Sequence, residues 1–210
     1  MFQRRHFLWV AANGLLAASC PRRVAAEPRA DLYQCDGCEG ALDGVPAELG
    51  AEGRIGPFDE PGEAFVLTGT VYQTDRTTPA SGVLVYAYQT TAKGLYEPTP
   101  GQTGIVRQHG RMRGWARTGP DGRYRFNTIK PAPYPVHTQP AHIHLMIGEP
   151  SRPIYWIDEV IFEGEYLVTD QYKRSRERRG GSGVVQLRRG AQREWLAIRD
   201  IYLEQHPEFQ

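Results

Sequence analysis

Short runs of β-forming residues, separated by turn residues, follow one another from residue 65 to residue 203. Successive side chains of a strand point to opposite faces, and the run 83–88, VLVYAY, is apolar or aromatic on both of them. Such a strand is expected at the centre of a sheet whose two faces are covered. Because little helical periodicity interrupts these runs, the sequence predicts an all-β fold, a single antiparallel β-sandwich of about eight strands with long loops.

The character of the chain changes near residue 63. Residues 63–210 carry the strand-like runs, and the sequence gives no sign of an internal repeat or a second domain there. Residues 27–62 are polar and rich in glycine, proline and acidic residues, which predicts an irregular N-terminal arm. A mature chain of about 180 residues is long enough to bury one hydrophobic core.

Residues 1–26 have the composition of a targeting segment. Arg4 and Arg5 precede a short apolar stretch that ends in small residues, a pattern typical of a twin-arginine (Tat) export signal. The apolar stretch is too short for a good transmembrane span. We therefore expect an exported protein, located in the periplasm or on the cell surface.

Cys20 follows residues 17–19, AAS, which resemble the cleavage box of a lipoprotein. A lipid on Cys20 would anchor the mature chain to a membrane, and the alternative is simple cleavage after residue 26. With cleavage before Cys20, the 25 basic residues lose the two arginines of the signal and become 23, against 24 acidic residues, so the formal charge is about −1. This balance gives no reason to expect nucleic acid as a partner.

The arm contains one pair of cysteines, Cys35 and Cys38, with the spacing of redox and zinc motifs. A tetrahedral zinc site would need two further ligands from elsewhere, and no thioredoxin-like pattern surrounds the pair. In an oxidising compartment the plainer prediction is a disulfide between Cys35 and Cys38 that closes a small loop. A metal or redox role is the alternative.

The segment from Tyr134 to His144, YPVHTQPAHIH, has the features of a metal site. On an extended strand His142 and His144 project to the same side, about 7 Å apart along the chain, so both imidazoles are able to bind one ion. Prolines between Tyr134 and His142 favour a stiff bend that brings the phenol back over the histidines. Phenolate and imidazole together suit hard trivalent iron better than zinc. The alternative is a surface or core His-x-His pair without a ligand role.

Five motifs occur together between Phe65 and Glu165: LTGTVYQ, GVLVYAYQTTAKGLY, TGPDGRYRFNTIKPAPYP, PAHIHL and IFEGE. Their combination resembles the intradiol ring-cleavage dioxygenases of the protocatechuate 3,4-dioxygenase type, in particular the beta subunit. The resemblance implies a β-sandwich and a non-haem ferric ion, Fe(3+). The ligands that it implies are Tyr96, Tyr134, His142 and His144.

The resemblance also implies a reaction. A catechol-type aromatic diol and O2 would be the substrates, and insertion of oxygen between the two hydroxyl-bearing carbons would give a muconate-type diacid. Tyr134 would leave the iron when the diol binds and would accept a proton from it, so Tyr134 is expected to be catalytic as well as a ligand. Because the family builds assemblies, the resemblance further implies a homo-oligomer.

Two positions depart from the family pattern. Where the catalytic members read Arg-Pro-Ala-His, this chain has Gln139 at the first position. The family arginine stabilises charge on the bound substrate, so Gln139 places a neutral amide at a predicted catalytic position. The position that carries a glutamine in the family is Glu159 here. These changes leave the implied ligands intact and alter the residues that would activate the substrate.

The segment 97–113 directly follows Tyr96 and is seventeen residues long, which is longer than most connecting loops in a compact domain. We expect it to roof the metal pocket and to help select the substrate. The alternative is that its polar side chains are exposed charges without partners. The candidate contacts are Arg107, His109, Arg111 and Arg113.

Two other classes of function fit parts of the sequence. His142, His144 and Glu149 have the local spacing of a cupin metal motif, although the glycine before His142 and the downstream Gly…His…Asn element are missing. The second class is a non-catalytic secreted β-sandwich that binds aromatics or glycans and retains a metal site. Gln139, in place of arginine, is the best argument for that second class.

Overall fold

The computed structural model describes residues 27–136 and 138–207. The predicted export signal and Cys20 therefore lie outside the described residues. Within the described ranges, no helix is long and apolar enough to cross a membrane.

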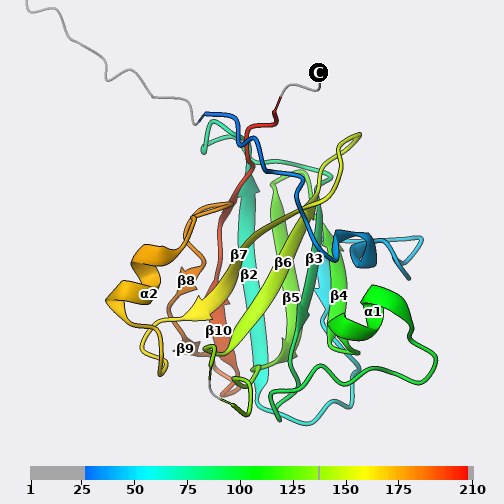
Figure 1. Cartoon of the computed structure of the whole chain (residues 1–210), viewed down its shortest axis with the longest axis vertical. Coiled ribbons are helices and arrows are strands. Elements are labelled where there is room, and N and C mark those ends of the chain that lie inside the picture. Colours follow the sequence, from blue (N-terminus) through cyan, green and yellow to red (C-terminus); the bar gives the residue numbers. More distant parts are fainter. Residues whose placement is uncertain (1–26, 137, 208–210) are drawn as a thin grey trace, which may run out of the picture.

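The described chain folds into two β-sheets that pack on each other, with short helices at the edges (Figure 1). The first sheet contains β1 (Glu52–Arg54), β2 (Ala64–Tyr72), β5 (Arg123–Ile129), β9 (Arg188–Arg189), β10 (Trp195–Ile198) and β11 (Ile201–Tyr202). The second contains β3 (Leu84–Gln89), β4 (Arg113–Arg117), β6 (His142–Gly148), β7 (Tyr155–Phe162) and β8 (Val184–Val185). The helices are η1 (Cys38–Ala41), α1 (Gly104–His109) and α2 (Asp170–Ser175).

The predicted all-β sandwich is confirmed, and its strand pairing is mixed rather than purely antiparallel. The strand orders are β1-β5-β2-β10-β9, with β11 beside β2, and β4-β3-β6-β7-β8. Parallel pairs are β1 with β5, β10 and β11 with β2, and β8 with β7. Parallel neighbours require a long crossover connection, and the pairing of β2 with β10 joins segments more than one hundred residues apart. Local residue patterns carry no information about which distant strand comes back to pair with β2.

The hydrophobic core lies between the two sheets and consists of apolar side chains on the inward faces of their strands. Phe65 and Leu67 of β2 enter it from one sheet, and Val85 and Ala87 of β3 enter it from the other. The ring of Phe65 meets Phe162 of β7 edge to face, with 5.6 Å between ring centroids. This is one of the core contacts that join the two sheets, and within the second sheet β6 is held between β3 and β7.

The outer face of β3 is covered as well, as the run 83–88 predicted. Tyr86 is fully buried in a second cluster with Cys38, Ala41 and Met146. Cys38 and Ala41 belong to η1, so the N-terminal arm packs on the outside of the second sheet. The arm is therefore not irregular throughout: η1 covers one sheet and β1 extends the other.

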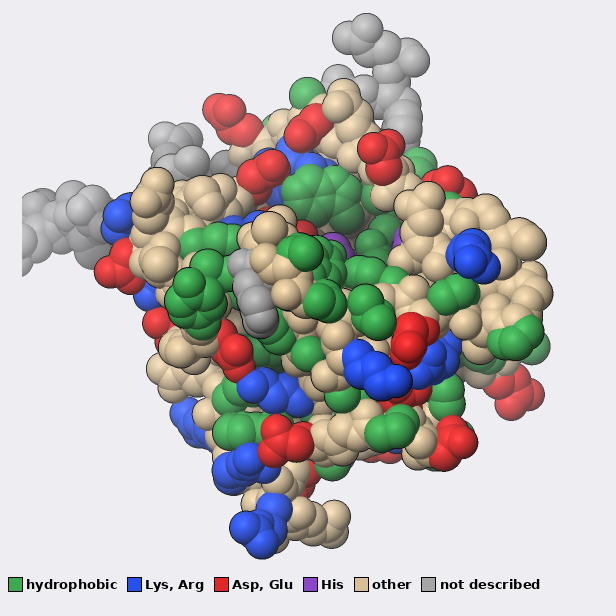
Figure 2. Space-filling view, turned by 60° about the horizontal axis from the view of Figure 1, so that its bottom comes forward, with side chains coloured by type: hydrophobic (Ala, Val, Ile, Leu, Met, Phe, Trp, Pro, Cys, Tyr) green, Lys and Arg blue, Asp and Glu red, His purple; other side chains and the backbone are tan. Residues whose placement is uncertain are grey.

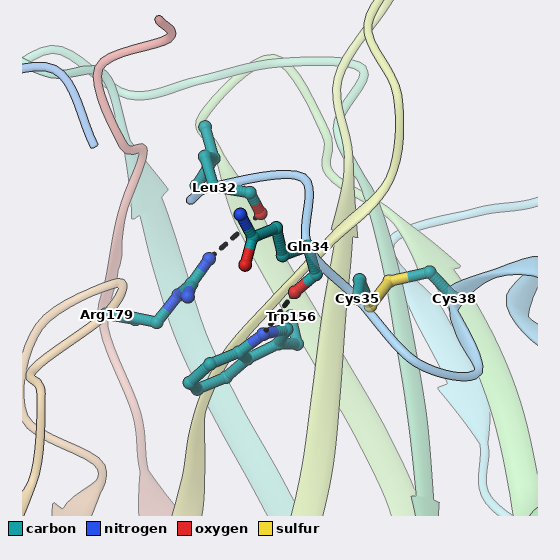
Figure 3. The surroundings of a disulfide bond; sticks show 6 residues. All are labelled: Leu32, Gln34, Cys35, Cys38, Trp156 and Arg179. Carbon is teal, nitrogen blue, oxygen red and sulfur yellow. Dashed lines mark hydrogen bonds between the residues drawn. A yellow bond between two sulfur atoms is a disulfide. The ribbon is translucent and has the colours of Figure 1, made fainter. Parts of the chain in front are cut away.

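A disulfide joins Cys35 and Cys38 at the start of η1 (Figure 3). Next to it, Nε1 of Trp156 on β7 donates a hydrogen bond to the carbonyl oxygen of Gln34 at 3.2 Å. The guanidinium of Arg179 lies over the Trp156 ring, 3.8 Å from its centroid. The disulfide loop is thus attached to the outer side of β7.

The close approach of β1 to β4 allows a stability test. A Cβ atom added at Gly53 would lie 2.0 Å from the carbonyl oxygen of Trp115, which is backbone and has no freedom to swing away. We expect Gly53→Ala to lower the free energy of unfolding by about 1–3 kcal/mol and the melting temperature by about 2–12 °C. Gly50→Ala is the control, since the nearest atom to its Cβ would be 3.9 Å away. Equal melting temperatures for the two variants, measured by circular dichroism, would contradict this packing.

Candidate metal centre

The four predicted ligands come from three separate parts of the chain and meet at one place. His142 and His144 lie on β6, Tyr134 lies between β5 and β6, and Tyr96 follows β3. The Nε2 atoms of the two histidines are 3.0 Å apart. The hydroxyl oxygen of Tyr96 is 3.3 Å from His142 Nε2. The hydroxyl oxygen of Tyr134 is 3.4 Å from both His142 Nε2 and the Tyr96 hydroxyl.

The spacing and chemistry of these donors fit a metal ion. Two donors that each lie about 2.0–2.1 Å from an ion, at an angle of roughly 90–110°, are about 2.9–3.4 Å apart. Among the described residues, no group of three or more His, Cys, Asp and Glu side chains has a metal-binding arrangement. The donor set is therefore two phenols and two imidazoles, a mixture that suits a hard trivalent cation.

The backbone before β6 sets the orientation of His142. Its Nδ1 atom lies 2.7 Å from the carbonyl oxygen of Pro140. A carbonyl only accepts hydrogen bonds, so Nδ1 of His142 carries the proton. Its Nε2 therefore presents a lone pair towards the other three candidate ligands. Hydrogen bonding of the second ring nitrogen commonly orients metal-binding histidines in this way.

A β-bulge determines the surroundings of His144. The pairing of β6 with β7 shifts register there, so that Asp158 and Glu159 both lie opposite His144. Bulges re-aim side chains and are frequent beside active sites. Here the bulge brings a carboxylate oxygen of Glu159 to 3.9 Å from His144 Nδ1. The other carboxylate oxygen of Glu159 pairs with Arg176.

Burial keeps two of the candidate ligands, His144 and Tyr96, neutral in the absence of a cation. Burial, the neighbouring imidazoles of His142 and His109, and the Arg176 guanidinium hold the pKa of His144 well below its usual value. Burial and the adjacent hydroxyl of Tyr134 raise the pKa of Tyr96. His144 is therefore unprotonated and ready to bind, whereas a phenolate at Tyr96 requires a nearby cation.

Tyr88 was not among the predicted site residues, and it lies at the centre of an aromatic stack. Its ring centroid is 4.4 Å from that of His144 on one side and 4.0 Å from that of His109 on the other. His109 Nδ1 is 2.8 Å from the hydroxyl of Tyr86. Burial and the positive charge of Arg113 lower the pKa of His109 to about 4, so its ring is neutral. The alternation in the run 83–88 places Tyr88 on the same face as Tyr86, and the pairing of β3 with β6 sets Tyr88 opposite His144.

The segment 97–113 does not roof the site as expected. It contains α1, and His109 at the end of α1 is buried behind Tyr88. Arg111 forms ion pairs with Glu60 and Glu97, both at 2.8 Å, and Arg107 is exposed. Its polar side chains serve the packing of the arm and of α1.

A cavity of about 540 Å³ opens beside His144. Its walls come from β3, β6, β7 and the N-terminal arm, and they include Tyr88, Trp156, Glu159 and residues 34–36. In Figure 2, histidine side chains are visible in a hollow between hydrophobic side chains. Of the four candidate ligands, His144 is the one that lines this cavity, beside the aromatic side chains of Tyr88 and Trp156.

Glu159 is expected to strengthen metal binding through His144. A carboxylate facing Nδ1 favours the tautomer in which Nε2 is free, and loss of such a partner typically costs ten- to a hundredfold in metal affinity. We expect Glu159→Gln to raise the dissociation constant for iron by about tenfold, measured by competition with a chelator. Glu163→Gln, which removes only a surface pair with Lys173 at 3.0 Å, is the control and should bind iron like the wild type. Equal affinity of all three proteins would exclude the role of Glu159.

We call the four converging side chains, Tyr96, Tyr134, His142 and His144, the donor cluster. Two further residues that the sequence analysis considered lie apart from it. Gln139 is exposed, and no hydrogen bond joins it to the cluster within the described residues, so its catalytic role stays a prediction. Glu149 follows β6 at the end opposite His142, where it accepts a hydrogen bond from Tyr155 at 2.7 Å and pairs with His206 at 3.1 Å. The cupin alternative is therefore wrong, because Glu149 faces these two residues and not the histidine pair on β6.

Comparison with known families favours the dioxygenase interpretation over the non-catalytic β-sandwich. A family model described as Dioxygenase matches residues 51–193, more than half of the chain, and this stretch includes the four candidate ligands. The chain belongs to the intradiol dioxygenase family. The chain is 31% identical over 153 residues to the chlorocatechol 1,2-dioxygenase of Rhodococcus opacus, covering 63% of this chain and 55% of the relative.

Other relatives bear similar names. The catechol 1,2-dioxygenase 1 of Acinetobacter lwoffii is 28% identical over 133 residues, which is 54% of this chain and 40% of the relative. The hydroxyquinol 1,2-dioxygenase of Rhizobium sp. (strain MTP-10005) is 30% identical over 141 residues, 54% of this chain and 46% of the relative. The chain thus spans about half the length of the curated relatives that it matches.

Solved structures share the fold. The dioxygenase domain of a dioxygenase carbohydrate-binding protein fusion from Streptomyces sp. SirexAA-E aligns with a TM-score of 0.56 at 23% identity, covering 78% of this chain and 96% of that one. Catechol 1,2-dioxygenase from Acinetobacter sp. ADP1 aligns with a TM-score of 0.57 at 22% identity, covering 77% and 59%. At these identities the likeness concerns the β-sandwich alone.

Proposed function

We propose that this protein is a non-haem ferric enzyme that cleaves a catechol-type diol with O2 to a muconate-type diacid. The observation that carries the proposal is the convergence of four side chains through contacts of 3.0–3.4 Å. Membership of the intradiol family, whose members are ferric enzymes, supports the same reaction. The names of the relatives, which refer to catechol, chlorocatechol and hydroxyquinol, support the substrate class.

In this proposal Tyr96, Tyr134, His142 and His144 would hold the ferric ion. When bound, the ion would supply Lewis acidity and a path for electrons that make the diol reactive towards O2. The His142 ring would keep its orientation, since its Nδ1–H bonds to a carbonyl oxygen at 2.7 Å. His144 would be held by its stack on Tyr88.

Tyr134 is the residue to which we assign proton transfer. It lies in an irregular segment between β5 and β6, whereas both histidines lie on a strand inside the second sheet. Its side chain is therefore freer than either histidine to swing away when a diol arrives. The phenolate oxygen of Tyr134 would then accept the proton that a diol hydroxyl releases.

The cavity beside His144 is the place that we assign to the ring of the diol. Tyr88 and Trp156 provide aromatic walls, and the buried side chain of Met146 adds apolar surface. Aromatic walls of this kind favour stacked or edge-to-face contacts with a planar ring.

Isotope labelling tests the reaction directly. Incubation of the iron-loaded protein with catechol under ¹⁸O2 should consume one O2 per catechol and give a diacid with one labelled oxygen in each carboxyl group. Mass spectrometry of the product and an oxygen electrode provide both readouts. Failure to take up oxygen with any simple catechol, or formation of an unlabelled quinone, would reject the proposal.

Export belongs to the same proposal. The disulfide between Cys35 and Cys38 supports a location in an oxidising compartment. We propose that the mature protein is exported, as a periplasmic protein or as a lipoprotein anchored through Cys20, and that it forms a homo-oligomer. Mass spectrometry of the N-terminal peptide distinguishes a lipid on Cys20 from cleavage after residue 26, and light scattering measures the oligomeric state.

A further inference from the structure

The N-terminal arm forms one wall of the cavity beside His144. Residues 34–36 line it on that side, while Tyr88, Trp156 and Glu159 line it from the sheet. A diol bound through its two hydroxyl groups at the donor cluster would direct its ring substituents away from the cluster, into the remaining space. The arm is therefore positioned to contact whatever substituent the ring carries.

This wall is held in a fixed position. The disulfide between Cys35 and Cys38 closes the loop, and Trp156 anchors it through the hydrogen bond described above. The loop also packs tightly against α1, because a Cβ atom at Gly37 would lie 3.1 Å from Nε2 of His109. A side chain presented by such a loop keeps its place when a ligand arrives.

The charge of the cavity is negative. Within the described residues, no lysine or arginine lines it, whereas two carboxylates do, Asp36 and Glu159. Glu159 is compensated by Arg176. Arg179 lies nearby, but it is buried and pairs with Asp31 at 3.5 Å. Asp36 is exposed and has no ion-pair partner in the described part of the chain, so it provides the uncompensated charge.

We propose that the disulfide loop of the arm is a specificity-determining wall of the diol pocket. Its Asp36 carboxylate selects diols whose ring substituent is cationic or neutral over diols whose substituent carries a carboxylate. This inference rests on the proposed function, because it assumes that the diol binds at the donor cluster. A substituent charge several Å from Asp36, in partly aqueous surroundings, changes the affinity by about tenfold.

Three shape-matched catechols test the inference. Dopamine, 4-ethylcatechol and 3,4-dihydroxyphenylacetate carry a cationic, a neutral and an anionic two-carbon substituent. Dissociation constants are measured without oxygen by calorimetry and tryptophan fluorescence, on the iron-loaded protein and on the metal-free protein. We expect the wild type with iron to bind dopamine about tenfold more tightly than 3,4-dihydroxyphenylacetate, with 4-ethylcatechol between them.

Two substitutions of the same residue and one control complete the test. Asp36→Asn should reduce the dopamine preference to less than about threefold, and Asp36→Lys should reverse it. Asp43→Asn removes a carboxylate of the same arm that does not line the cavity, so it should retain the wild-type preference. A wild type without the preference, an Asp36→Asn variant that keeps it, or an iron-loaded protein that binds none of the three compounds would overturn the inference.

Failure of this inference is distinguishable from failure of the proposed function. Binding that depends on the charge at residue 36, without cleavage of any diol in air, would reject the dioxygenase reaction and retain the selective wall. Cleavage of all three diols with equal binding would retain the reaction and reject the selective wall.

Discussion

His142→Ala is expected to abolish specific iron binding. The substitution removes the nitrogen donor that contacts the other three candidate ligands, at 3.0–3.4 Å. Loss of an orienting partner outside the ligand set already costs ten- to a hundredfold in metal affinity, so loss of a ligand should raise the dissociation constant by more than about a hundredfold. Equilibrium dialysis against a chelator, followed by metal analysis, measures this change.

His206 offers a matched control for the loss of an imidazole. It lies near the end of the chain, where it pairs with Glu149 at 3.1 Å and contacts the hydroxyl of Tyr33. His206→Ala should lower thermal stability and leave the iron affinity unchanged. If His142→Ala kept full iron affinity, or if both variants lost it equally, the ligand assignment would be wrong.

Tyr134→Phe is expected to separate metal binding from turnover. Phenylalanine keeps the ring and removes the oxygen that we assign both to the metal and to the proton of the diol. Tyr96, His142 and His144 remain, so iron should still bind, with weaker affinity and altered colour. A lost proton acceptor typically costs 10²- to 10⁴-fold in rate, and we expect kcat for catechol to fall by about that factor.

Tyr88→Phe is the control for the loss of a phenol at this site. Tyr88 stacks on His144, with 4.4 Å between ring centroids, and its hydroxyl is not among the donor atoms that converge. Phenylalanine preserves the stack, so iron content, colour and kcat should stay close to those of the wild type. Unchanged kinetics in Tyr134→Phe, or an equal loss in Tyr88→Phe, would reject the assigned role of Tyr134.

Local sequence patterns predicted the parts of the fold that depend on neighbouring residues. The two apolar faces of the run 83–88 indicated a covered central strand, and β3 lies between β4 and β6 with η1 on its outer side. The His-x-His spacing predicted that His142 and His144 point the same way, because alternation is a local property of strands. In the structure their Nε2 atoms are 3.0 Å apart.

The parts that the sequence did not predict depend on contacts between distant segments. The position of the arm depends on long-range contacts such as the hydrogen bond from Trp156 to Gln34 and the packing of Cys38 and Ala41 on Tyr86, which leave no periodic signal. The proximity of Glu159 to His144 arises from a register shift that is specific to the β6–β7 pair. For the same reason Asp36 did not emerge as a site residue, since its relation to the cavity exists only after the arm has packed.

The most direct test of the ferric centre is a metal analysis and visible absorption spectrum of the purified mature protein, repeated after anaerobic addition of catechol. Tyrosinate bound to ferric iron colours a protein, so we predict a red-brown protein with one iron per chain and an absorption band that shifts when catechol binds. A protein that stays colourless after reconstitution with iron, or that holds only zinc or copper, would contradict the assignment of Tyr96 and Tyr134 as ligands.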